Sequence, residues 1–150
     1  MKIIGFRSGI KGIRFAILEQ TSQGITCINL DTENELKIPT NFSNIEDQVE
    51  WVNSEIERIF RQNPEIERVM IKSPEFTPKD SLTKRATNYF DAILLLNAKR
   101  FSKLVETKLY SQIGVKRVDV KTKAESLYGV TLKKWDEQMA DAILIAHLGF

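Results

Sequence analysis

The sequence contains few of the residues that form disulfides, zinc sites or nucleophilic triads. It has a single cysteine, Cys27, and a single histidine, His147. One cysteine cannot form an internal disulfide, and one histidine with no cysteine nearby lacks the spacing of a zinc site. Ser8 has no histidine partner within a motif, so a catalytic triad is not indicated. We therefore interpret Cys27 as a buried small hydrophobic residue in a strand and His147 as a residue at a helix end.

Long apolar runs and low-complexity tracts are also missing. No uninterrupted apolar run is longer than that of residues 92–96, which is far too short to span a membrane. The apolar run at the start of the sequence is too short for a signal peptide. Four prolines and seven glycines without a biased tract leave little room for a linker. We expect a cytoplasmic protein with one domain over residues 1–150, no membrane contact and no cofactor.

The charges are unevenly distributed, although the formal net charge is only +2. Residues 31–67 contain ten acids and three bases, whereas residues 77–123 contain eleven bases and four acids. Such a separation of charge can steer a polyanion toward one side of a protein. The alternative is that these charged side chains simply lie on the solvated surfaces of helices and have no binding role.

The first half of the sequence predicts three strands, a helix and a fourth strand. Short apolar runs separated by turn signals at Gly9 and Gly24 favour an antiparallel meander. Ser43 and Glu46 fit a capping box, and Pro64 ends the helical spacing that follows. The expected elements are strands over 2–7, 12–20 and 25–30, a helix between 43 and 64, and a strand over 68–72.

The second half predicts a long helix, a fifth strand and a last helix. Helical spacing runs for almost thirty residues from Leu82, with Thr77 or Asp80 as its N-cap, a bend near Asn97 and a stop at Gly114. A strand over 115–120 and a helix over 135–148 follow. A meander followed by alternating helices and strands predicts an α/β fold, in which helices cover both faces of a five-stranded mixed sheet.

This order of elements resembles the RNase H-like superfamily over essentially the whole chain. Three segments are similar to its RuvC-type Holliday junction resolvase branch, namely residues 3–9 (IIGFRSG), 69–72 (VMIK) and 141–147 (DAILIAH). A looser similarity is to small bacterial proteins of this fold that have no assigned function. An actin-like ATPase half begins with a similar meander, but it needs a glycine-rich phosphate loop, for which residues 8–12 are a weak match.

The resemblance implies a site at which nucleases of this superfamily hold two magnesium ions with carboxylates. The family's acids map to Arg7, Lys72 and Asp141, and a further ligand one helical turn before Asp141 maps to Gln138. The formal charge at the mapped positions thereby changes from negative to +1. Because Mg²⁺ prefers anionic oxygen ligands, we expect a degenerate active site with no metal and no catalytic residue at these vestigial positions.

Two alternatives give Asp141 another role. A relocated metal site could use Glu75, Glu137 and Asp141, although acids in a loop or a first helical turn are common without a ligand. Otherwise Asp141 pairs with Arg7, Lys72 or both as a structural ion cluster, and a spare cation could bind an anion such as phosphate.

The basic segment offers further binding residues. Candidate nucleic-acid contacts are Lys79, Lys84, Arg85, Lys99, Arg100 and Lys103. In the resolvase family the corresponding helix also forms part of a dimer interface, and the apolar excess over residues 90–96 favours a homodimer. Trp51 and Trp135 are expected to pack in the core or in an interface.

The sequence leaves three functions open. The leading hypothesis is a non-catalytic RNase H-like module that acts as an interaction or assembly protein with an unidentified protein partner. The second is a nucleic-acid-binding protein that uses the basic face over residues 77–123. The third is a metal-dependent nuclease with a relocated carboxylate site. A fold by itself does not choose among them.

Overall fold

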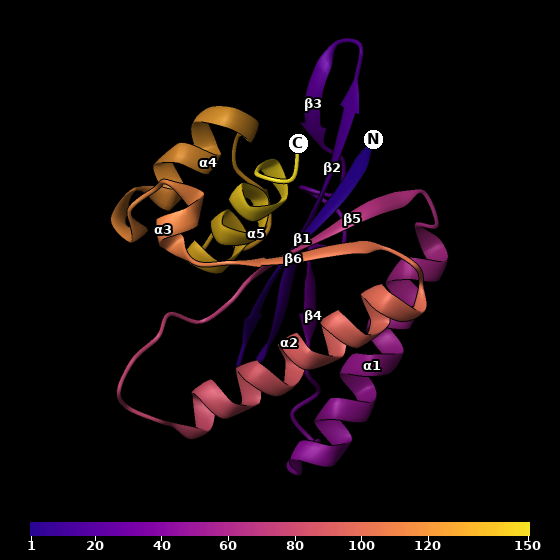
Figure 1. Ribbon diagram of the computed structural model, residues 1–150, viewed down its shortest axis with the longest axis vertical. Helices are drawn as coiled ribbons and strands as arrows, with labels where there is room; N and C mark the ends of the chain where they lie inside the picture. The colour runs from indigo at the N-terminus through magenta and orange to yellow at the C-terminus, as the bar shows by residue number, and fades with distance from the viewer.

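A mixed six-stranded sheet lies at the centre of the molecule (Figure 1). The computed structural model describes residues 1–150. The strands are β1 (Lys2–Gly9), β2 (Gly12–Thr21), β3 (Gly24–Cys27), β4 (Glu35–Lys37), β5 (Ile66–Lys72) and β6 (Leu104–Lys108). Their order is β3-β2-β1-β5-β6, and β4 pairs with β2. The first three strands form an antiparallel meander, and β5 and β6 join β1 in parallel.

Two long helices cover one face of the sheet. They are α1 (Ile45–Gln62) and α2 (Leu82–Arg100), which lie side by side below the sheet in Figure 1. Ile4 and Phe6 of β1 point toward them, because alternate residues of a strand face opposite sides. These residues belong to a cluster of 19 buried hydrophobic residues, against which Trp51 packs. This cluster forms the larger part of the core.

The opposite face is covered by α5 (Glu137–His147), with α4 (Val120–Tyr128) packed against it. A short helix, α3 (Tyr110–Ile113), and a 3₁₀ turn over Arg117–Asp119 lead from β6 to α4. Gly5 of β1 allows α5 to come very close, since an added Cβ there would lie 2.1 Å from the Ala142 carbonyl oxygen. The close approach brings the first turns of α5 to the carboxyl ends of β1 and β5.

The α/β fold with a mixed sheet and helices on both faces is confirmed. The sheet has one strand more than expected, because β4 is only three residues long and buries a single side chain, Leu36. So short an element shows no alternation in the sequence. The third strand is also shorter than expected and ends at Cys27.

The predicted strand over residues 115–120 is wrong. Val118 is 84% exposed in the 3₁₀ turn, and Val120 begins α4, a helix that the sequence did not indicate. The last strand is instead β6, where the long helix was expected to continue toward Gly114. The helix ends at Arg100, Ser102 turns the chain with a φ of 55°, and parallel pairing to β5 then holds residues 104–108 extended.

The predicted helix starts need two corrections. The Ser43–Glu46 capping box does not form, because α1 begins after Asn44 and that residue makes no side-chain cap bond. The N-cap of α2 is neither Thr77 nor Asp80. It is Ser81, whose hydroxyl accepts a hydrogen bond from the Lys84 backbone N–H at 3.1 Å.

Cys27, His147 and Trp135 each lie in a packed environment that is consistent with a structural role. Cys27 is half-buried in β3, and its burial raises the pKa of the thiol to about 11, so the thiol stays protonated at neutral pH. His147 lies in the last turn of α5, with its Nδ1 2.7 Å from the Tyr128 hydroxyl. Trp135 packs against the core beneath α5. None of the helices combines the length and apolar character that crossing a membrane requires.

Candidate functional site

The structure brings Arg7, Lys72 and Asp141 together at the carboxyl ends of β1 and β5. The parallel register pairs Phe6 with Ile71, so Arg7 and Lys72 come next on adjacent strands. Arg7 Nε donates to Asp141 Oδ2 at 3.2 Å. The Asp141 side chain is fully buried, whereas that of Arg7 is 19% exposed. An ion pair therefore joins two of the three mapped positions.

Tyr110 completes the environment of Asp141. Its hydroxyl lies 2.9 and 2.8 Å from the two carboxylate oxygens and donates to them. Burial raises the pKa of Asp141, while the Tyr110 hydroxyl and the charges of Arg7 and Lys72 oppose that rise. Burial and the nearby Asp141 charge raise the pKa of Tyr110, which keeps the phenol protonated as a donor.

The Lys72 ammonium donates its hydrogen bonds to the loop that follows β5 rather than to Asp141. Its side chain is fully buried, and Nζ donates to the Ser73 carbonyl at 2.6 Å and to Glu75 Oε1 at 2.9 Å. The ammonium also lies 3.9 Å from the centre of the Tyr110 ring, a cation–π contact. Desolvation alone would raise the pKa of Glu75, but hydrogen bonds from the Tyr110 backbone N–H and from Lys72 hold it below its usual value.

These residues do not fit a pair of magnesium ions. Arg7 and Lys72 are cations, Gln138 offers only a neutral amide, and the one acid, Asp141, already neutralises Arg7. The acids of the alternative cluster are engaged as well, since Glu137 accepts from Arg117 Nε at 2.7 Å and Glu75 from Lys72. The structure has no group of three His, Cys, Asp or Glu side chains placed to hold a metal ion.

A groove of about 570 Å³ opens over these strand ends. We call it the cationic groove, because five of its lining residues are basic and one is acidic: Arg7, Lys72, Lys79, Lys84, Arg117 and Glu75. Lys84 Nζ donates only to the carbonyl and hydroxyl oxygens of Thr77, both at 3.2 Å. Polar Ser and Thr side chains line much of the remaining wall. This lining suits a phosphate or another anion.

The six basic residues expected to contact nucleic acid do not form one surface. Lys79 and Lys84 line the cationic groove, and Arg85 beside them is paired with Asp80. The other three, Lys99, Arg100 and Lys103, lie at the far end of α2. A helix of this length places them about 24 Å from Lys84. Only two of the six therefore belong to the groove.

Asp91 of α2 is a buried acid that the sequence interpretation missed. It is 7% exposed, and its Oδ1 and the neighbouring Ser8 Oγ have no hydrogen-bond partner at acceptable geometry. Burial raises the pKa of Asp91 to about 6, while Ser8, Arg7 and Lys72 act to lower it. The helical spacing could have indicated that Asp91 is buried, because it shares one side of α2 with Thr87, Leu94 and Ala98, which are buried as well. Tyr110 gave no comparable signal.

Asp91→Asn is expected to stabilise the protein at neutral pH. The folded-state pKa of about 6 exceeds the ordinary value of 3.8, so Asp91 contributes stability below about pH 4 that is lost as the pH rises through 6. The difference corresponds to about 2–3 kcal/mol at pH 7. Urea unfolding at pH 4, 5, 6 and 7 measures it. The gap between variant and wild type should grow with pH, and a gap independent of pH would contradict the expectation.

Comparisons with known proteins agree on the fold. No family model matches the sequence, and no curated protein matches it. Among solved structures, T. thermophilus RuvC in complex with Holliday junction substrate superimposes with a TM-score of 0.78 at 14% identity, over 99% of this chain and 92% of that one.

Two further resolvases have the same fold. The yeast mitochondrial Holliday junction resolvase Ydc2 gives a TM-score of 0.64 at 15% identity, over 97% of this chain and 77% of that one. The fowlpox virus Holliday junction resolvase gives 0.57 at 16% identity, over 99% of both chains. The resemblance noted in the sequence is thus confirmed for the fold. The chain has the RNase H-like fold in the form found in RuvC and other Holliday junction resolvases.

Proposed function

We propose that this protein is a non-catalytic RNase H-like module that binds a nucleic-acid backbone in the cationic groove. The Arg7–Asp141 ion pair inside that groove carries the proposal. It sits at the positions that the family resemblance assigns to metal ligands, and it puts a guanidinium where a nuclease needs an anion. Arg is well suited to phosphate, because its guanidinium presents a planar fork of donors.

Electrostatics favours phosphate over a divalent metal at these positions. Two unit charges 4 Å apart interact with about 4 kcal/mol at an effective dielectric of 20, and the value doubles for a divalent ion. Arg7 and Lys72 would therefore both oppose a bound Mg²⁺. Because Asp141 and Glu75 already pair with them, the attraction for a phosphodiester comes chiefly from Lys79 and Lys84, which form no ion pair. T. thermophilus RuvC, which shares the fold, is known in a complex with a Holliday junction. That complex supports a nucleic acid as the polyanion.

Removing Lys79 and Lys84 at the mouth of the groove should weaken nucleic-acid binding and make the affinity depend less steeply on salt concentration. Each phosphate contact contributes about 1 to the slope of log K against log salt, so Lys79→Ala with Lys84→Ala should lower the slope by about 2. We expect affinity to fall about 10-fold at low salt. Gel shifts with labelled branched, single-stranded and double-stranded DNA and RNA, over a range of NaCl concentrations, measure both quantities.

The matched control removes the same number of charges at the other end of α2. Lys99→Ala with Arg100→Ala should leave binding unchanged, and an equal loss in both double variants would contradict the groove as the binding site. The same reactions are run with Mg²⁺ or Mn²⁺ and scored for cleavage. Metal-dependent cleavage that Asp141→Asn abolishes would overturn the non-catalytic assignment and favour the relocated site of Glu75, Glu137 and Asp141.

An assembly role has one specific observation in its favour. Helix α2 exposes Leu82, Tyr89 and Leu96, which are 82%, 48% and 48% exposed and recur every seven residues on the side away from the core. Such a stripe is typical of a helix that packs against another helix. The homodimer expected from the sequence therefore remains a second proposal.

A further inference from the structure

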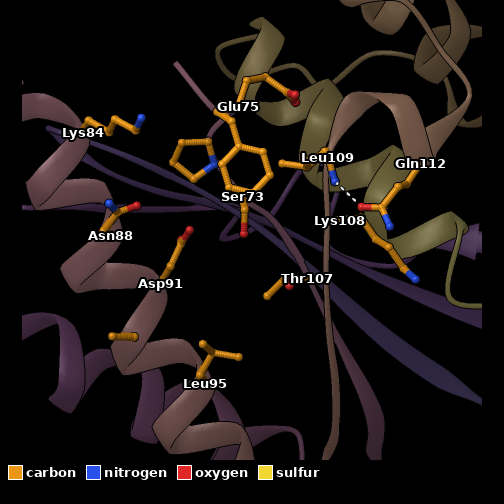
Figure 2. Close-up of a pocket in the computed structure, with 13 residues that line it drawn as sticks. Ser73, Glu75, Lys84, Asn88, Asp91, Leu95, Thr107, Lys108, Leu109 and Gln112 are labelled. Atoms are coloured by element: carbon orange, nitrogen blue, oxygen red, sulfur yellow. Dashed lines mark hydrogen bonds between the residues drawn. The ribbon is translucent and has the colours of Figure 1, made fainter. Parts of the chain in front are cut away.

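A second cavity, beside the cationic groove, lies between α2 and β6. It measures about 780 Å³, and Figure 2 shows its lining. Asn88 and Asp91 point into it from α2, and Thr107 and Lys108 of β6 lie across from them. We call it the α2–β6 pocket. Pockets of this size that combine apolar walls with a few polar groups are typical sites for small molecules.

Asp91 is the unusual group of the α2–β6 pocket. A buried carboxylate oxygen without a hydrogen bond is costly, and native proteins rarely keep one without a purpose. An ionised carboxylate can only accept hydrogen bonds, and the neighbouring Ser8 hydroxyl brings a single proton, so a molecule bound at Asp91 must supply the other donors. The terminal torsion of Asp is broad, which lets a small rotation turn both oxygens toward the pocket.

The other residues that line the pocket indicate what kind of molecule would carry these donors. Leu95, Leu109 and Phe76 supply apolar surface, and the Phe76 side chain is 89% exposed. Asn88 and Thr107 add polar groups beside Asp91. Apolar walls around a few hydrogen-bonding groups suit a flat heterocycle that carries N–H groups on one edge.

The charges near the pocket favour a nucleotide over a cationic side chain of a protein. Lys84 and Lys108 line the pocket, and Lys108 is paired with Glu106 at 2.8 Å. Lys84, which forms no ion pair, would repel an incoming lysine or arginine and attract phosphate. The pocket also adjoins the cationic groove, because Pro74, Glu75 and Lys84 line both. Lys84, Asn88 and Asp91 lie on one side of α2 and span about 10 Å along its axis. A nucleotide has a comparable reach from its phosphate to the far edge of its base.

We propose that the α2–β6 pocket binds a guanine nucleotide, with Asp91 accepting hydrogen bonds from the ring N–H and the exocyclic amino group. Guanine presents these two donors side by side, which matches the two oxygens of a carboxylate. Adenine and cytosine present one donor beside an acceptor, and the acceptor would face a carboxylate oxygen. The guanine comes from a free nucleotide or from an unpaired residue of a nucleic acid, and the second source rests on the function proposed above.

Asp91→Asn should change the base preference of the pocket rather than only weaken it. The variant amide offers one donor and one acceptor, the complement of xanthine, whose oxygen replaces the amino group of guanine. Titration calorimetry with guanosine, adenosine, inosine and xanthosine monophosphates is run on both proteins at pH 7.5. Wild type should prefer guanosine over adenosine monophosphate by about 10- to 100-fold. The variant should lose that preference and gain affinity for xanthosine monophosphate.

Controls separate recognition by the pocket from loss of structure. Asp119→Asn makes the same change at an exposed acid outside the pocket and should bind like wild type. Circular dichroism checks the fold of each variant. Equal affinity of wild type for all four nucleotides, or an Asp91→Asn variant with unchanged preferences, would overturn the proposal.

Oligonucleotides distinguish this proposal from the proposed function. Single strands with and without one guanine are compared by gel shift with both proteins. A preference for the guanine strand that disappears in Asp91→Asn supports both. Binding of both strands without preference overturns guanine recognition and leaves the groove intact. Binding of guanosine monophosphate without binding of any strand keeps the pocket and overturns nucleic-acid binding, and no binding at all overturns both.

Discussion

Replacing Asp141 by alanine is expected to lower the free energy of unfolding by about 3–5 kcal/mol. The carboxylate is fully buried, pairs with Arg7 at 3.2 Å and accepts from the Tyr110 hydroxyl. Without it, Arg7 keeps a mostly buried positive charge and Tyr110 keeps a donor without an acceptor. Removing one partner of a buried pair costs more than the pair contributes, because the remaining charge, here 19% exposed, regains only part of its hydration. Urea unfolding at pH 7 measures the loss.

A double variant shows whether the loss comes from the unpaired charge. Arg7→Met together with Asp141→Leu removes both charges while keeping apolar volume, and should recover most of the stability. Asp119→Ala, at an exposed position, should change stability by less than about 0.5 kcal/mol. If Asp141→Ala behaves like that control, Arg7 reaches solvent through the groove and the ion pair has no structural role.

The sequence predicted the elements whose stability is local. Strands β1, β2 and β5 and helices α1 and α5 carry their own hydrophobic periodicity, so their existence followed from spacing. The convergence of Arg7, Lys72 and Asp141 could be expected only through the family resemblance, because it depends on strand order. The β1–β5 register and the close approach of α5 then place these side chains together.

The segment over residues 101–129 could not be predicted because tertiary contacts determine it. Strand β6 has a weak apolar pattern and is held by pairing with β5. Helix α4 buries only Val120 and Ala124, too few side chains to produce a clear helical stripe. Tyr110, which contacts both Lys72 and Asp141, lies in this segment. The part of the site that was missed thus comes from the part of the chain whose structure depends on its surroundings.

Asp91 was missed for a different reason. Its helix was predicted, but Asp91 was counted only as one of four acids among eleven bases on a charged surface. Its position relative to the core decides its role, because Thr87, four residues before it on α2, and Leu94, three residues after it, are buried. A charged residue on the buried side of a helix departs from the local pattern, and such departures concentrate at functional sites.

Gly5→Ala should be strongly destabilising, with a loss of about 3–5 kcal/mol or failure to fold. The added methyl group would lie 2.1 Å from the Ala142 carbonyl oxygen and 2.7 Å from the Ala146 backbone nitrogen. Both contacts are with the backbone of α5, so the helix itself would have to move away from β1. Overpacking of this kind cannot be relieved by a change of rotamer. Thermal and urea unfolding measure the loss.

Gly9→Ala, on the same strand, provides the matched control for this argument. Its added methyl group would meet only the side chain of Gln138, at 2.7 Å from Nε2, and that side chain can rotate away. We expect a loss below about 1 kcal/mol. In Gly5→Ala a displaced α5 would also carry Asp141 away from Arg7, so the variant should lose the stabilising effect of the ion pair. Adding Asp141→Ala to Gly5→Ala should then cost less than Asp141→Ala costs alone, whereas full additivity would mean that α5 had not moved.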